Sequence, residues 1–155
     1  MNSHNHIWFP YTQMENAPAP LKVIKGEGLY LYLEDGRKII DGISSWWTCL
    51  HGHCHPRLME ALKKQTTKLD HVIFAGFTHE PAEDLASELV KIAPWNDAKV
   101  FYSDNGSTAV EIAIKMAIQY QINTGNEHKT KIATLKGGFH GETFGSMALA
   151  GKDGF

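Results

Sequence analysis

Residues 99–123 read KVFYSDNGSTAVEIAIKMAIQYQIN and place a short apolar segment, a polar turn and a long helical pattern in succession. Residues 99–103 are typical of a buried strand, and the apolar residues of 107–123 recur at helical spacing along one face. Gly125 follows as a stop, and a second short apolar segment occupies residues 131–135. A strand, a helix and a further strand in this order predict an α/β fold, with a mostly parallel sheet flanked by helices.

The turn before the long helix, residues 103–108 (Ser-Asp-Asn-Gly-Ser-Thr), is a candidate phosphate site. The first amides of a helix lack internal partners, and the helix dipole adds partial positive charge there. Gly106 would let a phosphate approach the backbone, and the Ser107 hydroxyl would donate to it. The alternative is a simple helix cap, in which Ser107 or Asn105 satisfies an unpaired amide. The pattern alone leaves both interpretations open.

A glycine-rich loop, residues 136–145 (KGGFHGETFG), follows the second predicted strand. Loops after the carboxyl ends of parallel strands meet at one edge of the sheet, so this loop is expected beside Gly106 and Ser107. The glycines would leave Phe139 exposed, where its ring could stack on a planar heterocycle. The alternative is that Phe139 belongs to the core and His140 is an ordinary loop histidine.

The first third of the chain has a different character. Residues 1–22 carry three prolines and little periodicity, which predicts an extended arm. Residues 28–43 alternate and contain the turn Glu34-Asp35-Gly36-Arg37, which predicts a β-hairpin. Two helices are expected over 56–69 and 81–93, each with a proline in its first turn. We expect two parts, an arm and hairpin over residues 1–50 and an incomplete larger domain over 51–155.

Composition excludes several classes of function. The chain has 155 residues, 43% hydrophobic and 21% charged, with a net charge of −2, which is ordinary for a globular protein. The absence of a basic stripe and of a long apolar run predicts no nucleic-acid partner and no membrane span. Two cysteines, Cys49 and Cys54, are too few for a disulfide scaffold and indicate the reducing cytoplasm.

A metal site over residues 49–55 is an alternative, because two cysteines and three histidines crowd there. The spacing lacks the paired blocks that let four ligands converge, so we expect no metal.

Five stretches resemble the class III aminotransferases, which are fold-type I enzymes that use pyridoxal 5′-phosphate. They are residues 6–12 (HIWFPYT), 41–47 (DGISSWW), 51–56 (HGHCHP), 104–113 (DNGSTAVEIA) and 138–145 (GFHGETFG). The first two stretches are most similar to the subgroup of biotin biosynthesis. The resemblance covers nearly the whole chain, and it implies that the arm and hairpin belong to the small domain and the remainder to the large domain.

The resemblance also implies roles for single residues. Gly106 and Ser107 would bind the phosphate of pyridoxal phosphate, and Phe139 would stack on its ring and line the substrate site. Tyr11 and Trp46 would contact the substrate. This subgroup usually has tyrosine where the chain has Phe139, so any role of that hydroxyl is lost. The implied reaction converts 8-amino-7-oxononanoate to 7,8-diaminononanoate, with S-adenosylmethionine or lysine as amino donor, in a homodimer.

The family's catalytic Schiff-base lysine has no counterpart in these 155 residues, because neither Lys136 nor Lys152 stands in its sequence context. We therefore expect a fragment that is inactive alone. Two alternatives stay open, namely another class III aminotransferase acting on ω-amino acids and a truncated module that only binds a partner.

Overall fold

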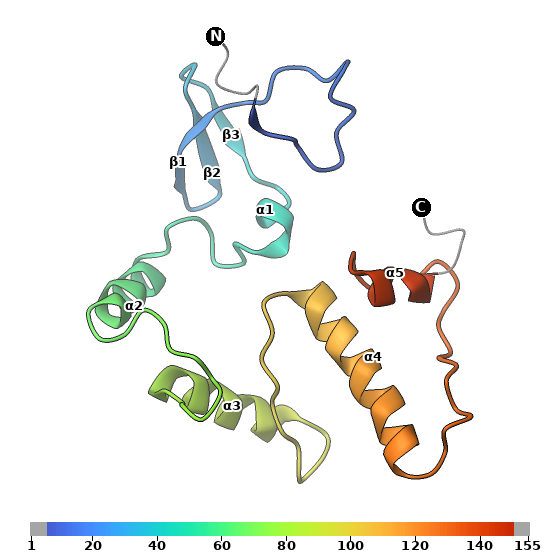
Figure 1. Cartoon of the computed structure of the whole chain (residues 1–155). Coiled ribbons are helices and arrows are strands. Elements are labelled where there is room, and N and C mark those ends of the chain that lie inside the picture. The colour runs from blue at the N-terminus through green and yellow to red at the C-terminus, as the bar shows by residue number, and fades with distance from the viewer. Residues whose placement is uncertain (1–5, 151–155) are drawn as a thin grey trace. The chain divides into compact units, whose positions relative to one another are not determined.

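The computed structural model describes residues 6–150, which form two compact units that divide between Phe77 and Thr78. Figure 1 shows the strands of the first unit and the helices of the second. Among the described residues, no helix has both the length and the apolar character that crossing a membrane requires. The predicted domain division at residue 50 stays a prediction.

The first unit contains an antiparallel sheet of three strands in the order β1-β2-β3. The strands are β1 (Val23–Glu27), β2 (Tyr30–Leu33) and β3 (Lys38–Ile40). The predicted hairpin is confirmed, with Tyr30 opposite Ile40 and Gly36 in the left-handed region at φ +87°. Leu33 is the buried hydrophobic residue of this sheet, with 2% of its surface exposed.

The strand β1 was not predicted from the sequence. Its residues Val-Ile-Lys-Gly-Glu do not alternate regularly, and its pairing with β2 shifts register between Val23 and Lys25. Gly26 has a packing reason, because an added Cβ would lie 2.9 Å from the Cβ of His53. Two further elements complete the unit, the single turn α1 (Ser44–Trp47) and the helix α2 (Pro56–Thr66), which is shorter than predicted.

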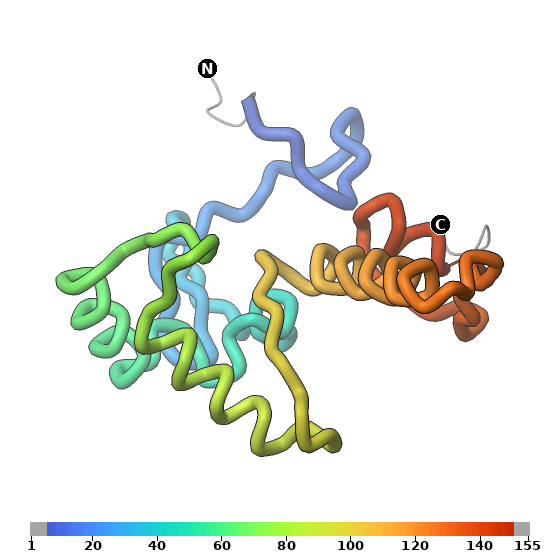
Figure 2. Tube along the Cα trace, turned by 60° about the horizontal axis from the view of Figure 1, so that its bottom comes forward, coloured from blue at the N-terminus to red at the C-terminus, as the bar shows by residue number. Residues whose placement is uncertain are grey.

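The second unit contains α3 (Glu80–Ile92), α4 (Gly106–Asn123) and α5 (Phe144–Ala150). The two long helices confirm the prediction to within one or two residues. Both have side-chain caps, since His79 accepts from the amide of Ala82 and Asn105 accepts from that of Thr108. After α4 the chain turns back, and α5 lies beside α4 (Figure 2). The helix α5 was missed because seven residues are too few to show a helical period.

The two strands predicted at 99–103 and 131–135 are wrong for the described chain, where both segments lack ladder partners. A strand exists only when its backbone groups pair with a neighbour, and apolar composition cannot supply that neighbour. The parallel sheet is therefore not formed among residues 6–150. Leu85 and Leu89 of α3, which the helical period places on an apolar face, are 50% and 38% exposed. Periodicity predicts which face of a helix is apolar but not which element packs against it.

Candidate functional site

The start of α4 combines a helix cap with two open amides. The amide of Thr108 donates to Asn105 Oδ1 at 3.0 Å, and the amide of Asn105 donates to Thr108 Oγ1 at 3.1 Å. The cap interpretation is therefore correct for Asn105 and wrong for Ser107. Within the described part of the chain, the amides of Gly106 and Ser107 have no partner, and a Cβ added at Gly106 would meet nothing within 4 Å. The cap leaves room for an anion beside it.

The Ser107 hydroxyl links the helix start to the glycine-rich loop. It accepts a hydrogen bond from the amide of Glu142 at 3.0 Å. Because a hydroxyl has one donor as well as two acceptor sites, its hydrogen stays available for a ligand. The approach is close, since a Cβ added at Gly141 would lie 2.7 Å from Ser107 Cα. The predicted proximity of the two loops is confirmed.

Glu111, one turn further along α4, holds the same loop and was missed from the sequence. Its Oε2 atom accepts from the hydroxyl of Thr143 at 2.5 Å and from the amide of Ser146 at 3.1 Å. The Thr143 hydrogen bond is the main reason that the pKa of Glu111 lies below its ordinary value. Ser146 itself is fully buried. The sequence signal was spacing, because Ser107 and Glu111 are four residues apart and share a helix face.

Phe139 lies outside the core, with 69% of its surface exposed. The core interpretation of this ring is therefore wrong for the described chain. Its neighbour His140 folds back on the loop, where a Cβ at Gly138 would lie 2.8 Å from His140 Nε2. That nitrogen is buried and has no hydrogen-bond partner among the described residues. The loop thus presents the phenyl ring outward and the imidazole inward.

In the first unit, the structure brings together the two residues expected to contact substrate. The rings of Tyr11 and Trp46 are stacked, with centroids 5.5 Å apart and planes inclined by 17°. The Trp47 ring meets Trp46 edge-on at 5.9 Å. Both Tyr11 and Trp46 are more than half exposed. They form an apolar surface, as a pocket for a long apolar substrate needs.

The backbone beneath these rings is strained. The residues Ser44, Ser45, Trp46 and Trp47 have φ between 46° and 66°, so α1 is a left-handed turn. Tyr11 has φ 51°, and Cys54 is the sixth and last such non-glycine residue in the described chain. This conformation costs an L-residue about 1–2 kcal/mol. No glycine marks the turn in the sequence, which is why it was not predicted.

Asp41 joins this turn to the following loop. Its Oδ2 atom accepts from the Ser45 hydroxyl at 2.6 Å and lies 2.8 Å from His53 Nε2. The hydrogen bond from Ser45, with His53 adding to it, lowers the pKa of Asp41 to about 2. The residue types are those of a hydrolytic triad, but the carboxylate stands in the middle. The serine donates to Asp41 and has no imidazole base, so the cluster cannot activate a nucleophile.

The histidine and cysteine cluster over 49–55 does not converge. Within residues 6–150, no three acidic, histidine or cysteine side chains are placed to hold one metal ion. His53 is engaged with Asp41, and the rings of His51 and His55 meet edge-on at 6.0 Å. Cys49 and Cys54 are free thiols.

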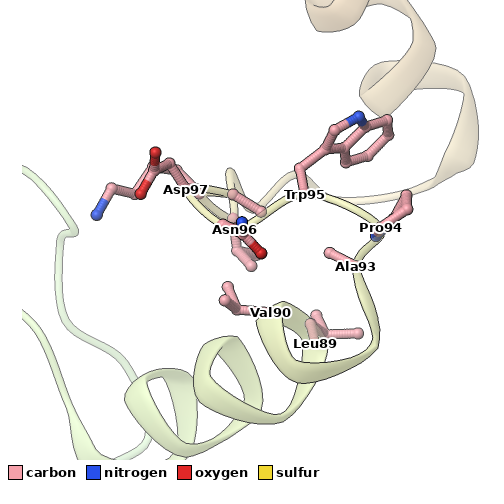
Figure 3. A pocket seen from close by; sticks show the side chains of 10 residues that line it. Leu89, Val90, Ala93, Pro94, Trp95, Asn96 and Asp97 are labelled. Carbon is pink, nitrogen blue, oxygen red and sulfur yellow. The ribbon is translucent and has the colours of Figure 1, made fainter.

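One depression of the second unit contains none of the predicted site residues. It has a volume of about 810 Å³ and is lined by the end of α3 and by residues 93–100. Figure 3 shows its lining, in which Leu89 and Val90 lie opposite the loop of Trp95 and Asn96. It is open, and both apolar residues and the polar residues Asn96, Asp97 and Lys99 line it. We therefore place the candidate site at the start of α4 and at the ring pair.

Comparison with known proteins identifies the family of this chain. A family model described as aminotransferase class-III matches residues 11–155. The chain is 54% identical over its whole length to adenosylmethionine-8-amino-7-oxononanoate aminotransferase of Synechococcus elongatus, covering 36% of that protein. It is 48% identical over 95% of its length to the enzyme of that name from Buchnera aphidicola of Schizaphis graminum, covering 34% of it. The chain thus spans about one third of the length of these relatives.

Solved structures show the same fold class. The enzyme of that name from Methanocaldococcus jannaschii superposes with a TM-score of 0.88 at 43% identity, over 93% of this chain and 33% of that one. An omega transaminase from Pseudomonas jessenii, in complex with PMP, superposes with a TM-score of 0.87 at 30% identity, over 97% of this chain and 35% of that one. These neighbours are fold-type I transaminases, which confirms the predicted α/β fold class. The chain therefore belongs to the class-III aminotransferase family.

Proposed function

We propose that this chain is the amino-terminal third of an aminotransferase that converts 8-amino-7-oxononanoate to 7,8-diaminononanoate in biotin biosynthesis. One observation carries the proposal, namely the contact of the Ser107 hydroxyl with the amide of Glu142. It joins an open helix start to an exposed phenyl ring on the adjacent loop. A ligand that carries both a phosphate and a planar ring needs an anion site and an aromatic ring side by side.

The residues at the start of α4 fit pyridoxal phosphate. The unpartnered amides of Gly106 and Ser107, the open space at Gly106 and the Ser107 hydroxyl would hold the phosphate. Phe139, which is exposed, would cover one face of the pyridine ring. When bound, this cofactor supplies an electron sink at the substrate carbon. Glu111 would keep the loop of Phe139 on the helix through Thr143.

Tyr11 and Trp46 would bind the apolar chain of the keto acid. Their stacked rings offer a flat surface with few polar groups, which suits a long apolar substrate. We infer that the catalytic lysine lies outside this chain, because neither Lys136 nor Lys152 stands in the family's sequence context, so catalysis would require the remainder of a longer enzyme. We further propose S-adenosylmethionine or lysine as amino donor, a homodimeric assembly and a cytoplasmic location, which the free thiols support.

The alternative is a class III aminotransferase for other ω-amines, which the likeness to the Pseudomonas jessenii structure favours. The two functions are separated by assaying the complete enzyme with 8-amino-7-oxononanoate and with simple ω-amines. We expect diamine from the keto acid. Exclusive turnover of simple ω-amines would replace the proposed substrate with the alternative.

Trp46→Ala tests the substrate surface. Because the ring is largely exposed, the variant should keep bound cofactor and a near-normal melting temperature. Its KM for the keto acid should rise tenfold or more, on the scale of about 1.4 kcal/mol per decade. A variant that melts early and binds the keto acid normally when folded would make Trp46 a packing residue.

A further inference from the structure

We propose that Asp41 is a positioning residue, which acts through Ser45 and His53 to hold the left-handed turn that sets Trp46 against Tyr11. The inference rests on the proposed function, since Trp46 and Tyr11 contact substrate only there. It assigns a role to three polar residues that touch neither the cofactor nor the substrate in the proposal above.

The turn needs an anchor because its own sequence opposes it. Four consecutive non-glycine residues, 44–47, have left-handed backbone angles. Two backbone hydrogen bonds close the turn. The amide of Trp47 donates to the carbonyl of Ile43, and the amide of Cys49 donates to the carbonyl of Ser44, each at 2.9 Å. Such strain persists only where the surroundings over-determine it, and it concentrates at functional sites.

Burial of the rings does not offset this strain in the described chain. Trp46 is 59% exposed, and Trp47 and Tyr11 are exposed still further. A turn that served only core packing would bury its large side chains. This turn instead presents two indoles and stacks one of them on the phenol of Tyr11. We infer that the strained turn serves to hold these rings at the surface.

The Asp41 carboxylate is the side-chain anchor. One oxygen, Oδ2, receives the hydroxyl of Ser45 and faces Nε2 of His53. Ser45 directly precedes Trp46, so the hydrogen bond fixes the residue on which the indole direction depends. Asp41 follows the end of β3, and its amide donates to the carbonyl of Leu29 at 2.9 Å. The backbone of Asp41 is thus bonded to the sheet, and its carboxylate is bonded to the turn.

His53 is itself fixed on the sheet. Its amide donates to the carbonyl of Gly28 at 2.8 Å, and the amide of Gly28 donates back at 3.0 Å. The absence of a side chain at Gly26 leaves the space that the His53 ring occupies. The side chains of Asp41 and His53 are 7% and 15% exposed, so water does not compete freely for their contact.

The experiment compares matched variants in the holoenzyme. His53→Leu removes the ring nitrogen, whereas His53→Gln keeps a nitrogen donor that can reach Asp41. Ser45→Ala removes the hydroxyl, and Asp35→Asn serves as a control because Asp35 binds Arg37 in the exposed hairpin turn. For each variant we would measure KM and kcat for the keto acid, and the near-ultraviolet circular dichroism of the coupled Tyr11 and Trp46 rings.

We expect Ser45→Ala and His53→Leu to raise KM roughly two- to tenfold, the scale of one lost hydrogen bond, with kcat nearly unchanged. The ring signal should fall in the same variants, and His53→Gln should restore both readouts. In a Trp46→Ala background, Ser45→Ala should add no further rise in KM, because the two changes act on one contact.

The proposal is overturned if Trp46→Ala raises KM while Ser45→Ala and His53→Leu leave KM and the ring signal intact. It is equally overturned if His53→Leu and His53→Gln lower stability and ring signal alike, which would make His53 a packing residue. An enzyme with no turnover of the keto acid would instead contradict the proposed function. The ring signal alone would then test the anchor, which fails if both His53 variants give the same spectrum.

Discussion

At the residue scale, the Ser107 hydroxyl accepts a hydrogen bond from the loop, and in the proposed function it would also donate to a phosphate. We expect Ser107→Ala in the complete enzyme to raise the Kd for pyridoxal phosphate about ten- to a hundredfold. That range corresponds to the loss of a hydrogen bond to a charged group, about 1.5–3 kcal/mol. Equilibrium titration of the apoenzyme with cofactor would measure the effect.

Thr108→Val is the matched control for Ser107. It removes the neighbouring hydroxyl that belongs to the helix cap, so it should lower the melting temperature without changing cofactor affinity. An unchanged Kd in Ser107→Ala would show that its hydroxyl serves the loop alone.

Phe139 is the second residue with a separable role. Phe139→Ala should weaken cofactor retention and leave the melting temperature of the apoenzyme nearly unchanged, because the ring is largely exposed. Phe139→Tyr should retain the cofactor, since the added hydroxyl leaves the ring face intact. Dialysis followed by absorbance of the remaining cofactor gives the measurement. A loss of about 3–5 kcal/mol in apoenzyme stability for the alanine variant would place Phe139 in a core.

At the scale of elements, the sequence predicted those helices and strands that have a local sequence pattern of their own. The hairpin over β2 and β3 and the helices α3 and α4 have alternation, helical period, prolines or capping residues of their own. The strand β1 and the turn α1 have none, because β1 depends on pairing with β2 and α1 depends on Asp41. The strand predictions for segments 99–103 and 131–135 were wrong because both segments are apolar but have no neighbouring strand in the described chain with which to pair.

The candidate site divides in the same way. Gly106, Ser107, Phe139, Tyr11 and Trp46 could be named because they stand in recognisable motifs. Glu111, Asp41 and His53 stand in the same motifs but were not singled out, because their roles depend on contacts with residues 12 to 35 positions away. Their side chains become informative only once the chain is folded.

The attachment of β3 to α1 and to the loop of His53 should respond to acid. The pKa of Asp41 is lowered in the folded chain to about 2, against an ordinary value of 3.8. The unfolded state therefore binds the proton more readily. Asp41 contributes stability above about pH 4, and this contribution is lost as the pH falls through about 2.

The difference in melting temperature between wild type and Asp41→Asn should thus shrink from pH 5 to pH 2. The comparison cancels the carboxyls that both proteins share, such as Glu111 and Glu27. A difference that stayed constant over this range would show that Asp41 titrates normally in the folded protein.

At the scale of the whole molecule, the two units bury little apolar surface. Leu33 and Ala82 are the buried hydrophobic residues among those described, whereas Ile92, Leu135 and Phe144 are at least 80% exposed. Exposed apolar faces of this kind drive association. We expect the 155-residue chain alone to self-associate and to form no diamine from keto acid, cofactor and amino donor.

Light scattering and a product assay would check both expectations. A monomer that melts cooperatively would contradict the first. Turnover that persists after removal of trace contaminants would contradict the second and would require a catalytic amine within these residues.

The contacts that join α4 to the glycine-rich loop have a consequence for biosynthesis. They connect residues only 32 to 36 positions apart, from Ser107 and Glu111 to Glu142, Thr143 and Ser146. Closing so short a loop has a modest entropic cost, and contacts of short sequence separation form early. On a translating ribosome, these contacts between α4 and the glycine-rich loop can form as soon as Ser146 has emerged from the exit tunnel. In the proposed enzyme, the phosphate site would then be complete while later segments were still being made.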